Sequence, residues 1–331
     1  MNKLLIPINI NNKLELHNRL VMPPMATFKT NDGSINDVLL KYYDEKTCGG
    51  YIGLVITEYA YISKEGKAGN GQVSICDDSC IEGFKKLTSI IHKNGSKVIC
   101  QINHAGSNTS KSITGMNVLG PSALPLPNKT SIPQEMTIDD INKVKDDFIK
   151  AALRAKEAGF DGVELHSAHA YLLNQFYSPL TNKRSDEYNG YTLEGRIKLH
   201  LDIIKEVRKA VGDDFVLAIR LGACDYIENG TSIDDSVKAC IEFEKAGVDL
   251  IDISGELCGG INPYNKEQGY FQEISIAVKN KINIPVILTG GIIKGTYANK
   301  LLEDNKAVLI GVGRAILKDS SWAKNAIEEL R

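Results

Sequence analysis

The chain has 331 residues, of which 43% are hydrophobic and 24% charged, with a formal net charge of −2. This is a globular composition, and the length suits a single α/β barrel. Dispersed charge excludes a basic surface for nucleic acid, and no apolar run reaches the ~18 residues of a membrane span. Because MNKLLIPINI lacks the apolar segment of a signal peptide, we expect a cytoplasmic protein that binds neither nucleic acid nor membrane.

The chain begins with a hairpin pattern and continues with alternating strands and helices. Residues LLIPINI and NNKLELHN predict a β-hairpin that caps the bottom of the fold. Short runs rich in β-branched residues predict eight strands, at 19–25, 53–59, 97–103, 162–166, 215–220, 249–254, 285–291 and 307–313. Apolar residues at three- and four-residue spacing predict helices at 138–159, 194–212, 232–247 and 320–331.

Eight strand–helix units predict an α/β fold, a (β/α)8 TIM barrel with an N-terminal β-hairpin cap. The segments KEAGFDGVEL and EKAGVDLIDI repeat the same helix end, glycine and strand, which favours such a barrel. A doubly wound sheet is the alternative, but no GxGxxG follows the first strand. We therefore expect a single barrel domain over residues 1–331.

Chemistry in such barrels lies at the carboxyl ends of the strands. After the seventh strand the sequence has Gly290–Gly291, and after the eighth it has Gly313–Arg314, each pair ahead of a helical segment. Unhindered backbone N–H groups, a helix N-terminus and an arginine are suited to a phosphate. The alternative is that these glycines only make tight turns.

The end of the fourth strand carries HSAHAYL, with His166, His169 and Tyr171. Side chains alternate along a strand, so the two histidines share a face only if the strand ends at His166 and a helical turn follows. Three interpretations compete: a metal site with Glu164 as third ligand, a buried structural cluster, and a substrate site. Seven cysteines with only Cys76 and Cys80 close together indicate reduced thiols, and we predict no bound metal.

Four stretches resemble the signatures of the NADH:flavin oxidoreductase, or Old Yellow Enzyme, family, in the family's order. They are NRLVMPPMAT (18–27), QINHAG (101–106), HSAHAYLLNQFYSPLTNKRSDEYNG (166–190) and LIGVGRAIL (309–317). The nearest likeness is to bacterial single-domain ene-reductases. The resemblance implies noncovalently bound FMN, NAD(P)H as reductant and a small electron-poor alkene as substrate.

The resemblance also implies which residues hold the flavin. Residues 23–26 would run along the isoalloxazine, Gln101 would bond its pyrimidine edge, Arg220 would face N1 and O2, and the glycines with Arg314 would hold the phosphate. For Arg220 the alternative is an ion pair with Glu164 or Asp252. The implied cofactor-binding set is Pro23, Pro24, Met25, Ala26, Tyr59, Gln101, Arg220, Thr289, Gly290, Gly291, Gly313 and Arg314.

For catalysis the resemblance implies that His166 and His169 bond the carbonyl or nitro oxygen of an enone, enal, nitroalkene or enoate. Hydride then passes from flavin N5 to the β-carbon, and Tyr171 protonates the α-carbon. The implied substrate-binding residues are Thr27, Phe28, His166, His169 and Tyr171.

The chain departs from many relatives at Ala26, where they have Cys or Thr, and at Phe28, where Tyr is common. The C-terminal arm of some relatives has no counterpart here, so a homodimer remains one open possibility. Two other functions stay open: a metal-dependent barrel hydrolase or aldolase using His166 and His169, and a non-catalytic FMN electron carrier or redox sensor.

Overall fold

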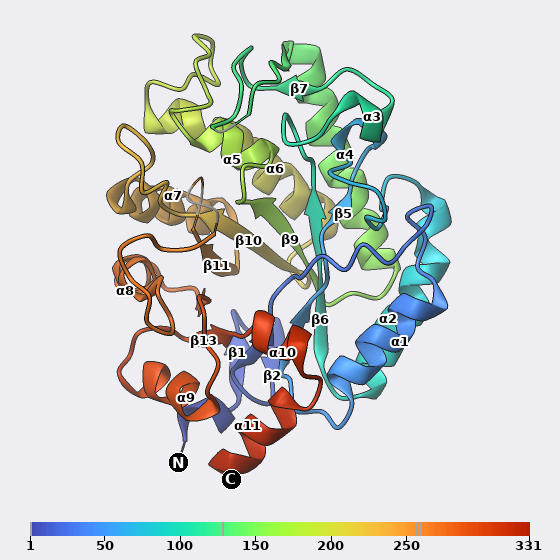
Figure 1. The fold of residues 1–331 in the computed structure, drawn as a ribbon, viewed down its shortest axis with the longest axis vertical. Helices are drawn as coiled ribbons and strands as arrows, with labels where there is room; N and C mark the ends of the chain where they lie inside the picture. Colours follow the sequence, from blue (N-terminus) through green and yellow to red (C-terminus); the bar gives the residue numbers. More distant parts are fainter. Residues whose placement is uncertain (1, 128, 256, 258–259) are drawn as a thin grey trace.

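Eight parallel strands close into a barrel with helices around it (Figure 1). The computed structural model describes residues 2–127, 129–255, 257 and 260–331. The barrel strands are β3 (Leu20–Met22), β4 (Leu54–Ile56), β6 (Lys97–Asn103), β9 (Gly162–Ser167), β10 (Val216–Gly222), β11 (Leu250–Ser254), β12 (Val286–Leu288) and β13 (Leu309–Gly311). The pairings of β13 with β3 and of β4 with β6 close the sheet. The predicted (β/α)8 barrel and its eight strands are confirmed.

The helices lie outside the sheet and follow the predicted periodicity. They are α1 (Asp37–Thr47), α2 (Ile81–Lys93), α3 (Lys111–Thr114), α4 (Ile138–Glu157), α5 (Leu172–Tyr177), α6 (Leu193–Val211), α7 (Ile233–Ala246), α8 (Gln272–Lys279), α9 (Gly295–Glu303), α10 (Arg314–Lys318) and α11 (Trp322–Leu330). Capping boxes at Thr137 and Ser232 begin α4 and α7. Of the described helices, none combines the length and apolarity needed to cross a membrane.

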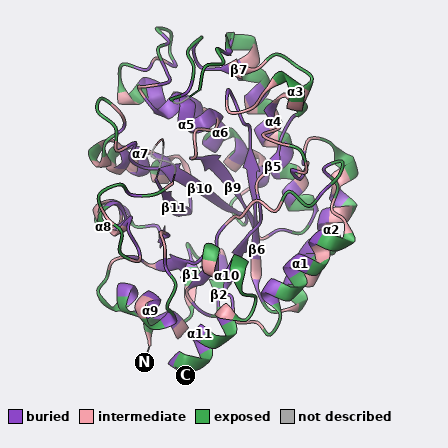
Figure 2. Cartoon of the chain, viewed as in Figure 1, coloured by how far each residue is buried: buried purple, intermediate pink, exposed green. Residues whose placement is uncertain are grey.

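Short elements extend this frame. They are the 3-10 helices η1 (Lys3–Leu5), η2 (Lys64–Gly66) and η3 (Asp78–Cys80), and the strands β5 (Ala60–Tyr61), β7 (Leu119–Gly120) and β8 (Gln134–Glu135). Strand β5 pairs with the end of β6, beyond the part that pairs with β4. The residues of the eight barrel strands are buried on both faces except for half-buried Lys97, as Figure 2 shows in purple, while the outer helix faces are exposed.

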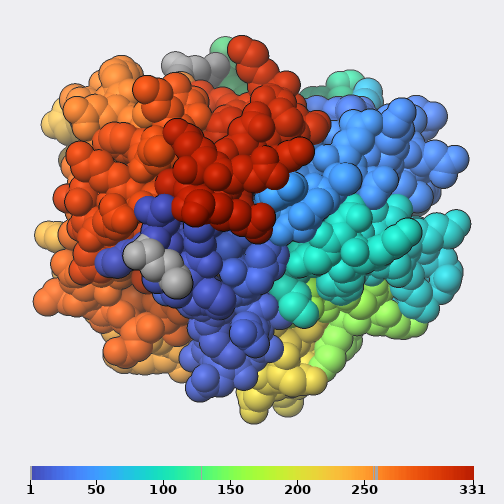
Figure 3. Space-filling view, turned by 90° about the horizontal axis from the view of Figure 1, so that it is seen from below, coloured from blue at the N-terminus to red at the C-terminus, as the bar shows by residue number. Residues whose placement is uncertain are grey.

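The N-terminal hairpin caps the bottom of the barrel, as predicted. Strands β1 (Ile8–Ile10) and β2 (Leu14–Leu16) pair antiparallel. Ile10 and Leu16 join the apolar cluster formed by inward side chains at the lower ends of the strands, among them Leu250. The turn is held to Asp249, which accepts from Asn11 Nδ2 at 2.7 Å and pairs with Lys13 Nζ at 2.8 Å. Figure 3 shows the blue N-terminal residues across this face, beside the red C-terminal ones.

Candidate active site

A cavity of about 600 Å³ opens at the carboxyl ends of the strands. This volume is typical of a site for a small molecule or cofactor. Its lining contains nine of the twelve predicted cofactor residues, namely Pro23, Pro24, Met25, Arg220, Thr289, Gly290, Gly291, Gly313 and Arg314. Ala26, Tyr59 and Gln101 do not line it. Segments separated by almost 300 residues therefore meet in one cavity.

The ends of β12 and β13 carry Gly290, Gly291, Gly313 and Arg314, which all line the cavity and are predicted to form an anion cradle. Gly290 and Gly291 have φ of 120° and 67°, values that glycine adopts readily. A Cβ on either would come within 2.9 or 2.8 Å of the Tyr270 ring, so the turn has no room for a larger residue. Arg314 begins α10, and its Nη2 donates to Tyr270 Oη at 2.9 Å. Backbone N–H groups beside a guanidinium fit the phosphate of FMN.

Arg220 lines the cavity from β10 and also takes part in a buried polar cluster. Its Nε lies 3.4 Å from Asp252 Oδ2, so the ion pair considered as an alternative exists together with the exposure to the cavity. Burial raises the pKa of Asp252 to about 6, against the opposing effect of Arg220. Gln101 Nε2 donates to Glu164 Oε1 at 2.8 Å, while its own Oε1 is buried without a partner among the described residues. A buried acceptor without a protein partner fits a bound polar ligand.

Two predicted substrate residues lie away from the cavity. Thr27 donates from its backbone N and Oγ1 to Glu58, at 3.1 and 2.8 Å. Phe28 is 50% exposed, with φ of 52°, and its ring lies beside Gly69. Neither lines the 600 Å³ cavity or the smaller one beside it. His166 and Tyr171 line neither cavity either, and the substrate role of all four residues stays a prediction.

His166, His169, Tyr171 and Tyr59 form one cluster at the ends of β9 and β4. The His166 ring centroid lies 5.0 Å from that of His169, 5.1 Å from that of Tyr171 and 5.8 Å from that of Tyr59. The predicted meeting of the two histidines is thus confirmed, but the predicted path between them is wrong. Strand β9 continues to Ser167, and the chain reverses through left-handed backbone at His169 and Ala170, with φ of 60° and 57°, in place of a helical turn.

The two imidazoles are neutral at ordinary pH. Burial lowers the pKa of His169 to about 3 and that of His166 well below its usual value, and Arg220 acts in the same direction on both. His169 Nε2 shares a hydrogen bond of 2.9 Å with Ser254 Oγ. His166 Nδ1 is buried without a partner among the described residues. Burial also raises the pKa of Tyr171, which therefore stays protonated.

A second cavity of about 290 Å³ lies on the other side of His169. Its lining is Asn108, Leu126, Pro127, Lys129, His169, Ala170, Leu257 and Gly260. The segment 105–136 thus forms part of the rim, as its Gly, Pro and Ser content indicated. Across residues 2–127, 129–255, 257 and 260–331, no three His, Cys, Asp or Glu side chains gather as metal ligands, so the metal-site interpretation finds no third ligand there.

Three polar residues of the site had no role assigned from the sequence. Ser254 stood at a strand end, Tyr270 lies in a segment whose shape no pattern indicates, and Gln175 is one residue of the long 166–190 stretch. Their only sequence signals are a polar residue at a strand end and membership of a signature stretch. The strand-end Glu256 and the thiol of Cys258 lie outside the described residues.

A barrel with a cofactor-sized cavity and an anion cradle between its last two strands defines a protein built to hold a phosphate-bearing cofactor. Residues 3–331 match the NADH:flavin oxidoreductase / NADH oxidase family, and the chain belongs to it. FMN is the cofactor that this family implies, and the glycines and Arg314 described above fit its phosphate.

Three relatives illustrate the likeness. An NADH oxidase of Thermoanaerobacter brockii is 37% identical over 322 residues, covering 95% of this chain and 49% of the relative. A 2-naphthoyl-CoA reductase, solved with 2-naphthoyl-CoA, has a TM-score of 0.92 at 28% identity, covering 99% of this chain and 52% of that one. Morphinone reductase has a TM-score of 0.87 at 25% identity, covering 99% and 90%. The chain spans about half the length of the first two, and the single-domain organisation stays a prediction.

Proposed function

We propose that this protein is an FMN-dependent, NAD(P)H-linked ene-reductase that reduces the C=C bond of electron-poor alkenes. One observation carries the proposal: two neutral imidazoles and a phenol converge beside a cavity that ends in an anion cradle. Such a group of donors, with no carboxylate among them, is suited to an oxygen that gains negative charge during the reaction.

In this proposal His166 and His169 bind the carbonyl or nitro oxygen of the substrate. Because both are neutral, they donate N–H hydrogen bonds without placing a full charge in a buried site. The bonds withdraw electrons from the conjugated alkene, and its β-carbon becomes the electron-poor end. They strengthen as charge develops on the oxygen, which in comparable sites contributes about 3 kcal/mol per donor to transition-state stabilisation.

Tyr171 gives the second hydrogen as a proton to the α-carbon. Its raised pKa keeps the proton available over the physiological range. Tyr59 lies within hydrogen-bond distance and supports the phenolate that remains after the transfer. The hydride and the proton together saturate one C=C bond.

FMN, when bound, would supply the hydride, which it regains from NADH or NADPH. Of this chain, Gly290, Gly291, Gly313 and Arg314 would hold its phosphate, residues 23–25 would form one wall of its site, and Arg220 would place a fixed positive charge against it. Buried Gln101 offers the acceptor described above. The roles of Ala26 and Tyr59 as further contacts belong to the same proposal.

The 290 Å³ cavity limits the substrate to a small molecule. We propose enones, enals, nitroalkenes or enoates, all of which carry the oxygen that His166 and His169 require. We also propose a homodimer, which light scattering tests, and a cytoplasmic location, which cell fractionation tests. A single-domain chain belongs to the same proposal.

The test separates the two half-reactions. The purified protein is expected to contain FMN, to be bleached anaerobically by NADH or NADPH, and to regain its colour on addition of an enone from a panel of alkenes. Tyr171→Phe is expected to slow recolouring at least tenfold and to leave bleaching within about twofold, as loss of a general acid requires.

Other results select the alternatives. A protein that is bleached and regains its colour only in air is an electron carrier or sensor. A colourless protein that binds zinc would overturn the proposal in favour of metal-dependent chemistry. Equal loss of both half-reactions in Tyr171→Phe would remove the proton-donor role.

A further inference from the structure

The turn that presents His169 is strained. His169 and Ala170 both have left-handed backbone, with φ of 60° and 57°. A residue with a Cβ is disfavoured in this conformation, and two such residues in succession persist only where neighbouring groups hold them. Strain of this kind at a site of convergent polar groups raises the question of what fixes the turn.

A single amide spans the loops that follow β6 and β9. Gln175 in α5 is fully buried, and its Nε2 donates to Ala170 O at 2.6 Å and to Ala105 O at 3.1 Å. Its Oε1 accepts from Ser107 N at 3.0 Å. Both amide N–H groups and the amide oxygen are therefore used, and all three bonds go to backbone atoms.

Neighbouring residues are fitted around this amide. Gly106 has φ of 58°, and a Cβ there would lie 2.4 Å from Gln175 Oε1. A second clamp acts on the same turn, because Asn108 Nδ2 donates to His169 O at 3.2 Å. The peptide on each side of Ala170 is thus bonded to the 105–108 loop or to the amide that anchors it.

We infer that Gln175 is a positioning residue for the alkene half-reaction. Its amide is fully used in bonds to backbone atoms, so its effect on the reaction passes through the turn. By holding Ala170 O it sets the direction of the His169 imidazole before the turn and of the Tyr171 phenol after it. The inference rests on the proposed function, since it assigns these two side chains to substrate.

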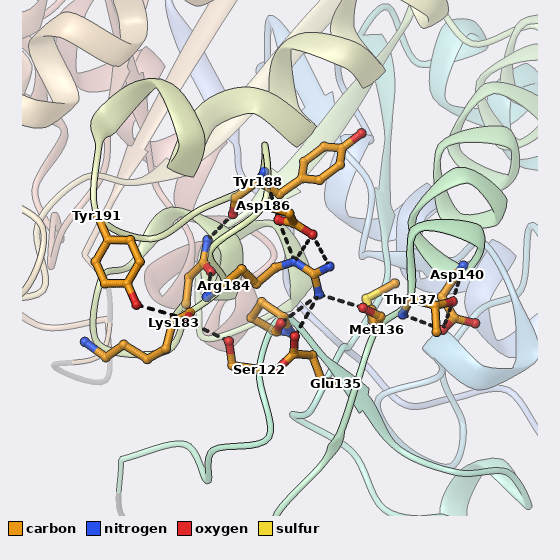
Figure 4. A network of polar contacts seen from close by, with 12 residues as sticks. Ser122, Glu135, Met136, Thr137, Asp140, Lys183, Arg184, Asp186, Tyr188 and Tyr191 are labelled. Carbon is orange, nitrogen blue, oxygen red and sulfur yellow. Dashed lines mark hydrogen bonds and ion pairs between the residues drawn. The ribbon is translucent and has the colours of Figure 1, made fainter.

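The same signature stretch contains a matched control at its far end. Asn182 is equally buried, and its Nδ2 donates to Phe176 O and Tyr188 O, each at 2.9 Å. Its Oδ1 accepts from the backbone of Arg184 at 3.1 Å, and Arg184 in turn bonds Pro121 O and Met136 O, in the network that Figure 4 shows. Asn182 therefore orders the segment ahead of α4 and leaves the His169 turn untouched.

The substitution Gln175→Glu tests the role through pH. A protonated glutamic acid keeps the shape of the amide, donates to Ala170 O and accepts from Ser107 N. A carboxylate donates nothing and faces two carbonyl oxygens. We expect alkene reduction by Gln175→Glu to approach the wild-type rate at pH 5 and to fall on the order of tenfold or more at higher pH, as misplacement of reacting groups predicts. Wild type and Asn182→Asp are expected to lack this step.

A spectroscopic readout keeps the inference separate from the proposed function. In protein labelled with ¹⁵N-histidine, the His169 ring resonances report its hydrogen bond to Ser254. In Gln175→Glu these resonances are expected to change with pH, with the same midpoint as the rate of alkene reduction. In Asn182→Asp they are expected to stay constant over the same pH range. If wild type reduces no alkene, the proposed function fails while these resonances still decide whether Gln175 sets the turn.

Three outcomes would overturn the inference. The first is a folded, FMN-loaded Gln175→Glu with the wild-type pH profile and His169 resonances. The second is an equal loss in Asn182→Asp. If Gln175→Glu does not fold, Asn108→Ala removes the other bond that holds the same turn. Unchanged His169 resonances in that variant are the third outcome.

Discussion

The Tyr171 hydroxyl donates a hydrogen bond to the Tyr59 hydroxyl across 3.0 Å, with ring centroids 5.3 Å apart. Tyr59 follows β4 and Tyr171 precedes α5, so the barrel brings together residues 112 positions apart. Burial raises the pKa of both phenols, and the bond between them acts in the opposite direction on Tyr171. Tyr171 is thus a protonated donor, and the Tyr59 hydroxyl can stabilise the phenolate that Tyr171 becomes after losing its proton.

Tyr59→Phe is expected to lower the rate of alkene reduction on the order of tenfold, because a hydrogen bond to a developing phenolate is worth about 1.5–3 kcal/mol. Bleaching by nicotinamide should change by less than about twofold, because no proton passes through Tyr171 in that half-reaction. Anaerobic stopped-flow absorbance measures both. Equal slowing of the two would instead assign Tyr59 to the flavin site alone.

Tyr270→Phe is expected to weaken FMN binding severalfold and to leave riboflavin binding unchanged. Its hydroxyl accepts a hydrogen bond from Arg314, and without this bond the guanidinium is held less firmly. The charge-assisted bond from Arg314 to the phosphate is then weakened, and riboflavin has no phosphate to lose it. Fluorescence titration of the apoprotein with each flavin gives both constants. Tyr264→Phe, on the same loop but 82% exposed, is the control. A parallel loss for riboflavin would show that Tyr270 acts only by packing on the glycines.

Asp249→Ala is expected to lower the free energy of unfolding by about 3–5 kcal/mol, the usual effect of removing one partner from a buried ion pair. Asp249 is buried and pairs with Arg208 and with Lys13 of the hairpin. The folded Asp249→Ala variant should keep wild-type FMN affinity and turnover, because Asp249 lies at the end of the barrel opposite the site. Chemical denaturation checks the first part, with Asp214→Ala, an exposed partner of Lys156, as control. Loss of FMN affinity in the folded variant would contradict the separation of the two ends.

His200 gives a pH prediction with a definite sign. Burial lowers its pKa to about 3, against about 6.5 in an unfolded chain. Between these values the unfolded state binds one more proton, so this contribution to stability is present above pH 6.5 and is lost as pH falls toward 3. His200→Asn should therefore reduce the pH slope of the unfolding free energy near pH 5 by about 1.4 kcal/mol per unit. Denaturation curves between pH 4.5 and 7 measure it, and parallel profiles would contradict the assignment.

The strands, the hairpin and the glycine cradle could be predicted because each depends on local pattern. Buried parallel strands appear as short β-branched runs, and Gly290–Gly291 announces a turn that few other residues allow. The path at His169 could not be predicted in this way. Both residues in left-handed backbone carry side chains, and the groups that hold them, Gln175 and Asn108, come from other loops.

The position of Tyr270 depends in the same way on tertiary contact. Its ring packs on two glycines about twenty residues away, and its hydroxyl meets an arginine from α10. The substrate roles of Thr27 and Phe28 stay predictions. Glu58 holds Thr27, and Phe28 has left-handed backbone and a half-exposed ring. Residues 23–25 line the 600 Å³ cavity, whereas Thr27 and Phe28, which follow them closely in the sequence, do not.

At Ala170 the backbone strain and the hydrogen bond to Gln175 depend on different atoms. Its methyl group is costly at φ of 57°, yet the contacts that matter to the site run through its carbonyl oxygen, which every residue possesses. Glycine at 170 would relieve backbone strain and keep the bond to Gln175, whereas glycine at 169 would delete the imidazole. Ala170→Gly can therefore raise the thermal stability of this barrel without removing a side chain of the site, whereas His169→Gly cannot.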